Sequence, residues 1–111
     1  MPTRKARGAE TQSLIAGYLR DNGWPYAQST GAGRSGSDIT GTPGLAIEVK
    51  ARRDFSPQAW LRQAALGGVG VPMVIHRPDG MGPASVAQWP VTMRLADLVG
   101  LLRDAGFGEP R

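Results

Sequence analysis

The chain has 111 residues, 41% of them hydrophobic, which is enough for one domain with a modest core and too short for two. It has no cysteine and a single histidine, which excludes disulfides, thiolate zinc sites, cysteine nucleophiles and multi-histidine metal centres. Its 13 Lys and Arg residues outnumber 9 Asp and Glu residues, and the net charge of +4 favours a polyanionic partner such as DNA. We expect a single domain over residues 1–111.

The hydropathy of the chain argues against a membrane location. No apolar leader follows the basic start, and no stretch approaches the roughly 18 apolar residues of a membrane span. The lack of cysteine also fits a reducing compartment. We therefore expect a soluble, cytoplasmic protein with no membrane partner.

The N-terminal segment is basic and then becomes helical. We expect residues 1–8 to form a flexible arm in which Arg4, Lys5 and Arg7 contact DNA phosphates, although a solvated basic surface is the plainer alternative. Apolar residues at helical spacing predict a first helix over residues 10–21, ended by an Asn-Gly pair. Glu10 lies at the edge of its apolar face, where by itself it would serve only to complement the helix dipole.

A glycine- and serine-rich loop follows at residues 31–37. It formally matches G-x-G-x-x-G, but the helix that a dinucleotide site requires does not follow it. The loop could instead bind phosphate through backbone amides together with Arg34 and Ser35, or it could be a plain connector.

The next two segments, residues 38–41 and 45–50, predict a hairpin that carries the candidate site. Apolar residues alternate along the second strand, so Glu48 and Lys50 share one face with their Cβ atoms about 6.5 Å apart. The turn leaves the position of Asp38 open. A type II turn centred on residues 43–44 would pair Asp38 with Val49, whereas a three-residue loop would pair it with Glu48. We predict a bulge, kink or irregular turn.

The remaining elements complete a sheet of four or five strands. Ser56 and Pro57 predict the start of a second helix, with Trp60 as a core anchor and Gln63 able to point back toward Lys50. Two further strands are expected at residues 71–77 and 86–93, the second interrupted by proline. An amphipathic helix over residues 94–105 is expected to close the domain. The lone His76 lies in an apolar run, which favours a structural role.

These residues suit metal-dependent cleavage of a phosphodiester. Asp38 and Glu48 supply oxygen ligands for Mg²⁺, and the Val49 carbonyl could add a third. Lys50 could position the attacking water and offset phosphate charge, and Glu10 could hold the ion through water. The alternative is a surface hairpin in which Glu48 and Lys50 form an ion pair worth at most about 1 kcal/mol.

The order of these features resembles the PD-(D/E)xK nuclease superfamily, and within it the archaeal-type Holliday-junction resolvases and their small phage relatives. The likeness rests on the basic start leading into Glu10, the Ser-Gly loop before Asp38, and the strand Leu45-Ala46-Ile47-Glu48-Val49-Lys50. It covers roughly the first two thirds of the chain.

The resemblance implies an α/β fold with a mixed sheet flanked by helices, like the restriction-endonuclease core. It implies Mg²⁺, or Mn²⁺ in its place, on Asp38 and Glu48, with Lys50 as the catalytic lysine and Glu10 as the first-helix acid. It further implies a homodimer that resolves branched DNA by symmetric nicks. The expected DNA contacts are Arg4, Lys5, Arg7, Arg34, Ser35, Arg52 and Arg53.

Two alternatives stay open. The short chain and the run Phe55-Ser56-Pro57-Gln58 also resemble the VRR-NUC branch, in which a glutamine follows the strand lysine and the nuclease substrates vary. The other alternative is a DNA-binding protein that uses the same basic residues without cutting.

Overall fold

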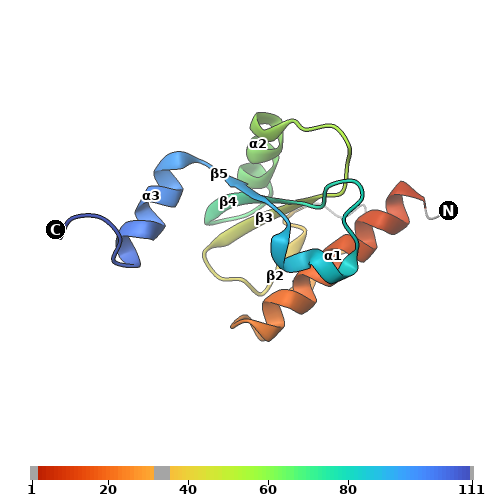
Figure 1. Ribbon diagram of the computed structural model, residues 1–111, viewed down its shortest axis with the longest axis horizontal. Coiled ribbons are helices and arrows are strands. Elements are labelled where there is room, and N and C mark those ends of the chain that lie inside the picture. The colour runs from red at the N-terminus through yellow and green to blue at the C-terminus, as the bar shows by residue number, and fades with distance from the viewer. Residues whose placement is uncertain (1–2, 32–35, 111) are drawn as a thin grey trace.

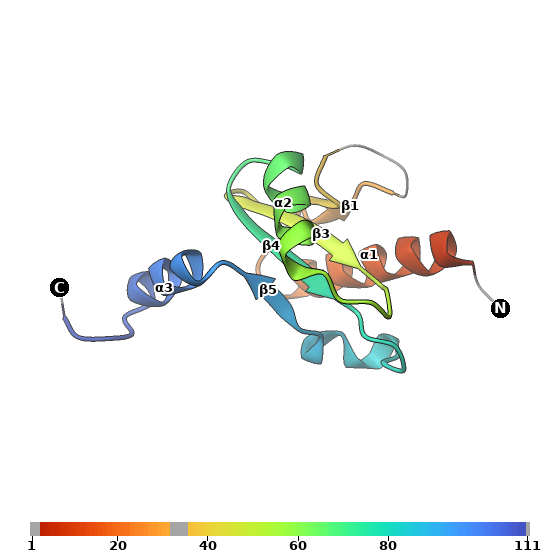
Figure 2. The same cartoon turned by 90° about the horizontal axis from the view of Figure 1, so that it is seen from above.

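The computed structural model describes residues 3–31 and 36–110 and shows a mixed five-stranded sheet between two helices (Figures 1 and 2). The strands lie in the order β1-β2-β3-β4-β5; β3 and β4 are parallel, and the other neighbours are antiparallel. The expected α/β fold with four or five strands is confirmed. In chain order the elements are α1 (Arg4–Asp21), β1 (Gln28–Ser29), β2 (Ile39–Thr40), β3 (Leu45–Lys50), α2 (Pro57–Gly67), β4 (Val71–His76), the 3-10 helix η1 (Pro83–Gln88), β5 (Val91–Met93) and α3 (Leu95–Asp104).

Helix α1 begins earlier than the apolar pattern predicts. The Thr3 side chain accepts a hydrogen bond from the Ala6 N–H at 3.0 Å and caps the helix, whose first residue is Arg4. The expectation of a flexible arm over residues 1–8 is therefore wrong for residues 3–8. Apolar spacing marks only the part of a helix that packs on a core, whereas the first turns of α1 are mostly exposed and are defined by their cap.

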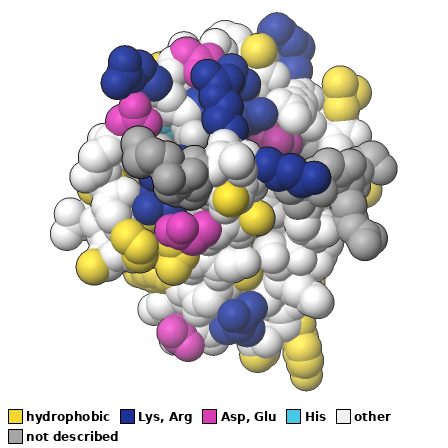
Figure 3. Space-filling model, turned by 90° about the vertical axis from the view of Figure 1, so that its right-hand side faces the viewer, with side chains coloured by type: hydrophobic (Ala, Val, Ile, Leu, Met, Phe, Trp, Pro, Cys, Tyr) yellow, Lys and Arg dark blue, Asp and Glu magenta, His cyan; other side chains and the backbone are white. Residues whose placement is uncertain are grey.

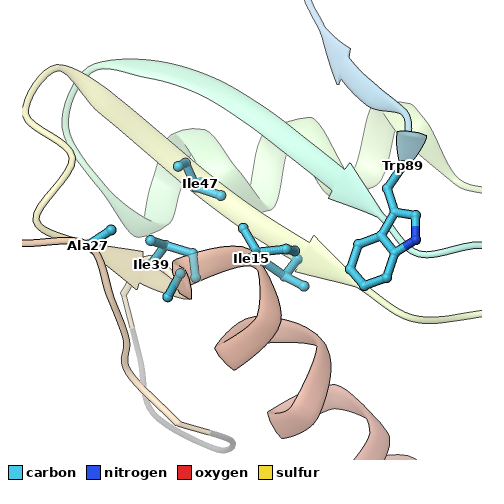
Figure 4. Packing of buried hydrophobic residues seen from close by; sticks show 7 residues of the cluster. Ile15, Ala27, Ile39, Ile47 and Trp89 are labelled. Carbon is cyan, nitrogen blue, oxygen red and sulfur yellow. The ribbon is translucent and has the colours of Figure 1, made fainter. Parts of the chain in front are cut away.

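The core lies on both faces of β3. Ile15 of α1 packs with Ile39 of β2, Ile47 of β3 and Trp89 in one buried cluster (Figure 4). A second cluster on the opposite face joins Trp60 and Leu61 of α2 to Val74 of β4. Trp60 is 4% exposed, so the expected core anchor is confirmed. Since side chains alternate along a strand, Ile47 faces α1 and Glu48 faces α2.

The connection between β2 and β3 has the predicted irregularity. The Leu45 N–H donates to the Thr42 carbonyl at 3.0 Å and Gly44 has a φ of 82°, as in a type II turn. Ile39 nevertheless pairs with Ile47, which requires one extra residue on the β2 side. Gly41, with a φ of 76°, is that residue. The connection thus keeps its type II turn and also has the register in which Asp38 lies across from Glu48.

The chain between β4 and β5 differs from the expectation of one strand over residues 86–93. Its first part belongs to η1, and the strand contains only Val91–Met93. The Trp89 ring is buried and its Nε1–H donates to the Ser85 hydroxyl at 3.1 Å, which holds this segment in a helical turn. Pro90 then separates the turn from the strand, because proline cannot continue a hydrogen-bonded ladder.

Helix α3 is present as predicted, but it does not close the domain. It projects from the β5 side, away from the end where α1 begins (Figures 1 and 2). None of its residues is buried, and its leucines are between 39% and 75% exposed. The amphipathic pattern predicted a helix correctly, but a pattern cannot show whether an apolar face is covered. In the part of the chain that the structure describes, no helix has the length and hydropathy needed to cross a bilayer.

Candidate active site

Asp38 forms hydrogen bonds with the two residues of β3 that precede and follow Glu48. Its backbone N–H donates to the Ile47 carbonyl at 3.0 Å, and its carboxylate Oδ2 accepts the Val49 N–H at 2.7 Å. The β2–β3 register, set by the pair Ile39 and Ile47, places Asp38 across from Glu48. The structure therefore brings together the two carboxylates that lie ten residues apart in the sequence.

Glu48 is buried on the α2 face, where its residue is only 5% exposed. Burial raises the pKa of Glu48 to about 7, and the hydrogen bond and negative charge of Asp38 contribute to this rise in pKa, while Lys50 opposes it. Two adjacent carboxyl groups resist holding two negative charges, so a cation between them would relieve an unfavourable arrangement. A divalent cation is one ligand that would offset both negative charges.

Lys50 and Gln63 complete the cluster from β3 and α2. The Lys50 Nζ lies 3.7 Å from Glu48 Oε1 and donates a hydrogen bond to Gln63 Oε1 at 2.9 Å. It also lies 5.9 Å from the centre of the Trp60 ring. Gln63 thus points from the helix back to the sheet, a position that the sequence allowed but did not favour over a solvated side chain. Its amide oxygen and the ring face restrict the lysine ammonium to one place beside the carboxylates.

Glu10 does not join this cluster in the structure. Its Oε1 accepts a hydrogen bond from Arg77 at 3.0 Å, and its side chain is 48% exposed. Helix α1 covers the face of β3 opposite to the Glu48 side chain, which explains the separation. Within residues 3–31 and 36–110, no three His, Asp or Glu side chains are grouped closely enough to hold a metal ion. Glu10 is therefore not a third direct ligand in this arrangement.

The residues nevertheless fit a magnesium ion with a small protein ligand set. Mg²⁺ is often held by one or two carboxylates, with water and substrate phosphate in the remaining positions. Asp38 and Glu48 supply such a pair of hard oxygen donors, and Val49, whose N–H donates to Asp38, lines the neighbouring cleft. The chemistry of these donors suits Mg²⁺ or Mn²⁺ rather than a softer metal.

A basic cleft of about 830 Å³ borders the end of β3. It brings together the first turns of α1 and the segment after β3, which are more than forty residues apart in the sequence. Six cationic side chains and two carboxylates line it, an excess of four positive charges. We call this region, whose charged residues are Arg4, Lys5, Arg7, Lys50, Arg52, Arg53, Asp54 and Asp79, the basic cleft.

The view onto the N-terminal end of α1 shows several Lys and Arg side chains gathered over the upper part of this face (Figure 3). Arg52 pairs with Asp54 at 3.0 Å and Arg53 with Asp79 at 3.1 Å. Both are exposed surface ion pairs, which are weak, so a phosphate could replace the carboxylate partner. All five of the expected DNA contacts that the structure describes line the cleft. The other two, Arg34 and Ser35, lie outside the described residues.

The sequence patterns assigned no role to Arg77 or to the Phe55 ring. Arg77 is 4% exposed, and it donates to Met81 O and Thr11 Oγ1 as well as to Glu10, so it is a structural centre between α1 and the end of β4. The sequence does contain one signal of this structural role, which is an arginine directly after an apolar strand. His76 is structural, as expected: its Nε2 lies 2.8 Å from the Arg52 carbonyl. Phe55 remains 59% exposed beside the basic cleft.

We compared the chain with protein-family models, curated proteins and solved structures, and found no significant match in any of the three comparisons.

Proposed function

We propose that the protein is a metal-dependent DNA endonuclease that hydrolyses phosphodiester bonds in branched DNA, with resolution of four-way junctions as its main activity. One observation carries this proposal: Lys50, which lines the basic cleft, contacts both Glu48 and Gln63, and Asp38 lies across from Glu48. Each group has a use in phosphodiester hydrolysis, and the cleft has the charge to hold the DNA. The absence of cysteine accords with a cytoplasmic location for this activity.

In this proposal Asp38 and Glu48 hold Mg²⁺, with the Val49 carbonyl as a further ligand. When bound, the ion supplies positive charge that stabilises the pentavalent transition state at phosphorus. Glu48 must give up its proton before it can bind the ion, and Lys50, at 3.7 Å, favours that ionised form.

Lys50 is the group that acts on the reacting atoms. Its ammonium can donate hydrogen bonds to the attacking water and to a non-bridging phosphate oxygen, which orients the water and offsets charge. The water oxygen forms a bond to phosphorus and the water releases one proton to solvent, one P–O ester bond breaks, and the leaving sugar oxygen takes up a proton from solvent. Gln63 is a positioning residue, because it holds the Lys50 ammonium in place through its amide oxygen.

Two parts of the proposal, branched DNA as the substrate and a homodimer as the assembly, rest on the resemblance to Holliday-junction resolvases. Resolving a four-way junction requires two symmetric cuts, which a homodimer with two such sites would make. The contact between Lys50 and Gln63 also favours the second candidate, a VRR-NUC-type nuclease that cuts flaps or other DNA, since that branch places a glutamine after the strand lysine.

A cleavage assay tests the proposal. Linear duplex, single-stranded, flap and four-way-junction DNA are incubated with the protein in Mg²⁺ and in chelator, and the products are mapped on a gel. We expect paired symmetric nicks near the junction centre that need Mg²⁺ and that fall about 100-fold or more in Asp38→Asn and Lys50→Ala. Glu10→Gln is the matched carboxylate control and should stay within about tenfold of the wild type, because Glu10 contacts Arg77.

The outcomes separate the candidates. Cutting of flaps or linear ends in preference to junctions would select the VRR-NUC-type activity. Binding of DNA without any metal-dependent cleavage would refute the nuclease and leave a non-catalytic DNA-binding protein. A loss in Glu10→Gln as large as that in Asp38→Asn would show that Glu10 acts in the site.

A further inference from the structure

Phe55 is an exposed aromatic residue that the proposed chemistry does not use. It follows the arginines and aspartate of the basic cleft directly in the chain and precedes α2. Its residue is 59% exposed, although two buried rings lie against it. Phe55 therefore directly follows the segment that lines a positively charged cleft, and part of its surface is open to solvent.

The ring is rigidly supported from beneath. Phe55 stacks on His76 with ring centres 5.7 Å apart and an interplanar angle of 23°, and it forms a T-shaped contact with Trp60 with ring centres 5.6 Å apart. Trp60 and His76 are 4% and 8% exposed and contact each other at 5.4 Å. These contacts cover part of Phe55, and the residue as a whole is still 59% exposed.

The segment that carries Phe55 is also held in place. His76 Nε2 lies 2.8 Å from the Arg52 carbonyl, an atom that can only accept, so the ring nitrogen donates and fixes the backbone just before Phe55. A ligand that stacked on Phe55 would therefore meet a preorganised surface and would not have to order a loop.

Local helix structure explains only part of this arrangement. Phe55 precedes the N-cap Ser56, and its contact with Trp60 is a hydrophobic staple, which any large apolar residue could make. A staple does not require a flat ring that is stacked on a buried imidazole and partly open to solvent. An exposed aromatic face beside a groove of cations is the combination that binds single-stranded nucleic acid, since cations follow the backbone and rings stack on the bases.

We propose that Phe55 is a stacking platform for one unpaired nucleobase, so that the DNA strand held in the basic cleft is single-stranded or locally unpaired where it passes this residue. The inference rests on the proposed function for the presence of DNA in the cleft, and it adds the class of substrate. The interior of a fully paired duplex has no free base face to offer, whereas a flap, a single strand or a junction with unstacked central bases does.

The test measures binding and not cleavage. Dissociation constants are determined in chelator for a single-stranded oligonucleotide and for the same sequence as a perfect duplex, using wild type, Phe55→Leu and Phe55→Tyr. The leucine keeps the staple with Trp60 but has no aromatic face, and the tyrosine keeps the face. Thermal denaturation verifies that each variant is folded.

We expect Phe55→Leu to weaken single-strand binding about tenfold or more, to leave duplex binding within about twofold, and to be rescued by Phe55→Tyr. Equal single-strand binding by Phe55→Leu and wild type, or an equal loss on both DNAs, would overturn the stacking proposal and leave the metal-dependent cleavage assay unaffected. If the wild type bound neither DNA, this proposal would fall together with the proposed function.

Discussion

At the scale of single residues, Glu48 carries the main electrostatic cost of the site. It is buried, it faces Asp38, and these two causes raise its pKa from an ordinary value of 4.5 to about 7. Between these two values the folded protein binds this proton and the unfolded chain does not. The contribution of Glu48 to the free energy of unfolding is therefore largest below about pH 4.5 and is lost as the pH rises to about 7.

Replacing Glu48 by glutamine should remove this dependence. In chelator, the free energy of unfolding of the wild type relative to Glu48→Gln should fall by up to about 3 kcal/mol between about pH 4.5 and pH 7.5, because a glutamine side chain has no proton to lose. Urea denaturation at several pH values measures both proteins. Parallel curves for the two proteins would contradict the raised pKa, and Asp97→Asn, on exposed α3, is a control that should keep the wild-type slope.

At the scale of elements, the β2–β3 connection decides whether a site exists at all. The type II turn by itself would pair Asp38 with Val49, and the extra residue Gly41 corrects the register by one. Gly41 and Gly44 both have positive φ, yet their surroundings differ. A Cβ on Gly41 would collide with the Tyr26 carbonyl, whereas a Cβ on Gly44 would meet open space.

This difference provides a matched pair of variants. Gly44→Ala should cost about 1 kcal/mol of stability, the strain of an alanine in the left-handed region, and should retain cleavage. Gly41→Ala adds a clash with backbone, so we expect a further loss of about 2 kcal/mol or more and about a tenfold or greater loss of Mg²⁺-dependent cleavage. Denaturation and the junction assay measure both effects. Equal behaviour of the two variants would show that the bulge does not set the register.

The elements also show how far sequence patterns reach. Period-two alternation correctly placed Glu48 and Lys50 on one face of β3, and Ser56-Pro57 correctly placed the start of α2. The strand expected over residues 86–93 was wrong in its first half, because the tertiary contacts of Trp89 hold that segment in a helical turn. The pairing of Glu10 with Arg77 was not predictable, since the partners lie 67 residues apart and meet only through the packing of α1.

At the scale of the whole molecule, the positive charge is concentrated at one end. The basic cleft lies where α1 begins, and Arg94 lies at the start of α3 on the opposite side of the sheet (Figure 1). Neutralising cleft residues should therefore affect DNA binding differently from neutralising Arg94. Four substitutions to alanine, at Arg4, Lys5, Arg52 and Arg53, should reduce the slope of log K against log salt by about 0.7–0.9 for each phosphate contact removed.

Salt titrations of binding in chelator check this expectation, with Arg94→Ala as the control that keeps the wild-type slope. An unchanged slope in the fourfold variant would exclude these residues from the interface. A reduced slope for Arg94→Ala would instead indicate that DNA reaches the α3 end of the molecule.

The exposure of α3 has its own consequence for stability. Leu98 on α3 is 39% exposed, whereas Ile47 in the core is 1% exposed. At concentrations where the protein is monomeric, Leu98→Ala should cost less than about 1 kcal/mol and Ile47→Ala about 2–5 kcal/mol. Denaturation at low and high protein concentration measures both, and sedimentation tests the proposed homodimer. A large cost of Leu98→Ala in the monomer would mean that α3 packs on its own domain.

The sequence by itself determined the features that depend on local physics. Alternation along a strand, capping residues, helical apolar spacing and the excess of basic residues defined the α/β class, the face shared by Glu48 and Lys50, and the candidate DNA contacts. The tertiary structure decided everything that depends on distant partners. It brought Asp38 to Glu48 through an extra glycine, paired Glu10 with Arg77, joined two basic segments into one cleft, and left Phe55 and α3 uncovered. The physical reason is that register and burial are set by packing between segments far apart in the chain, which no local pattern contains.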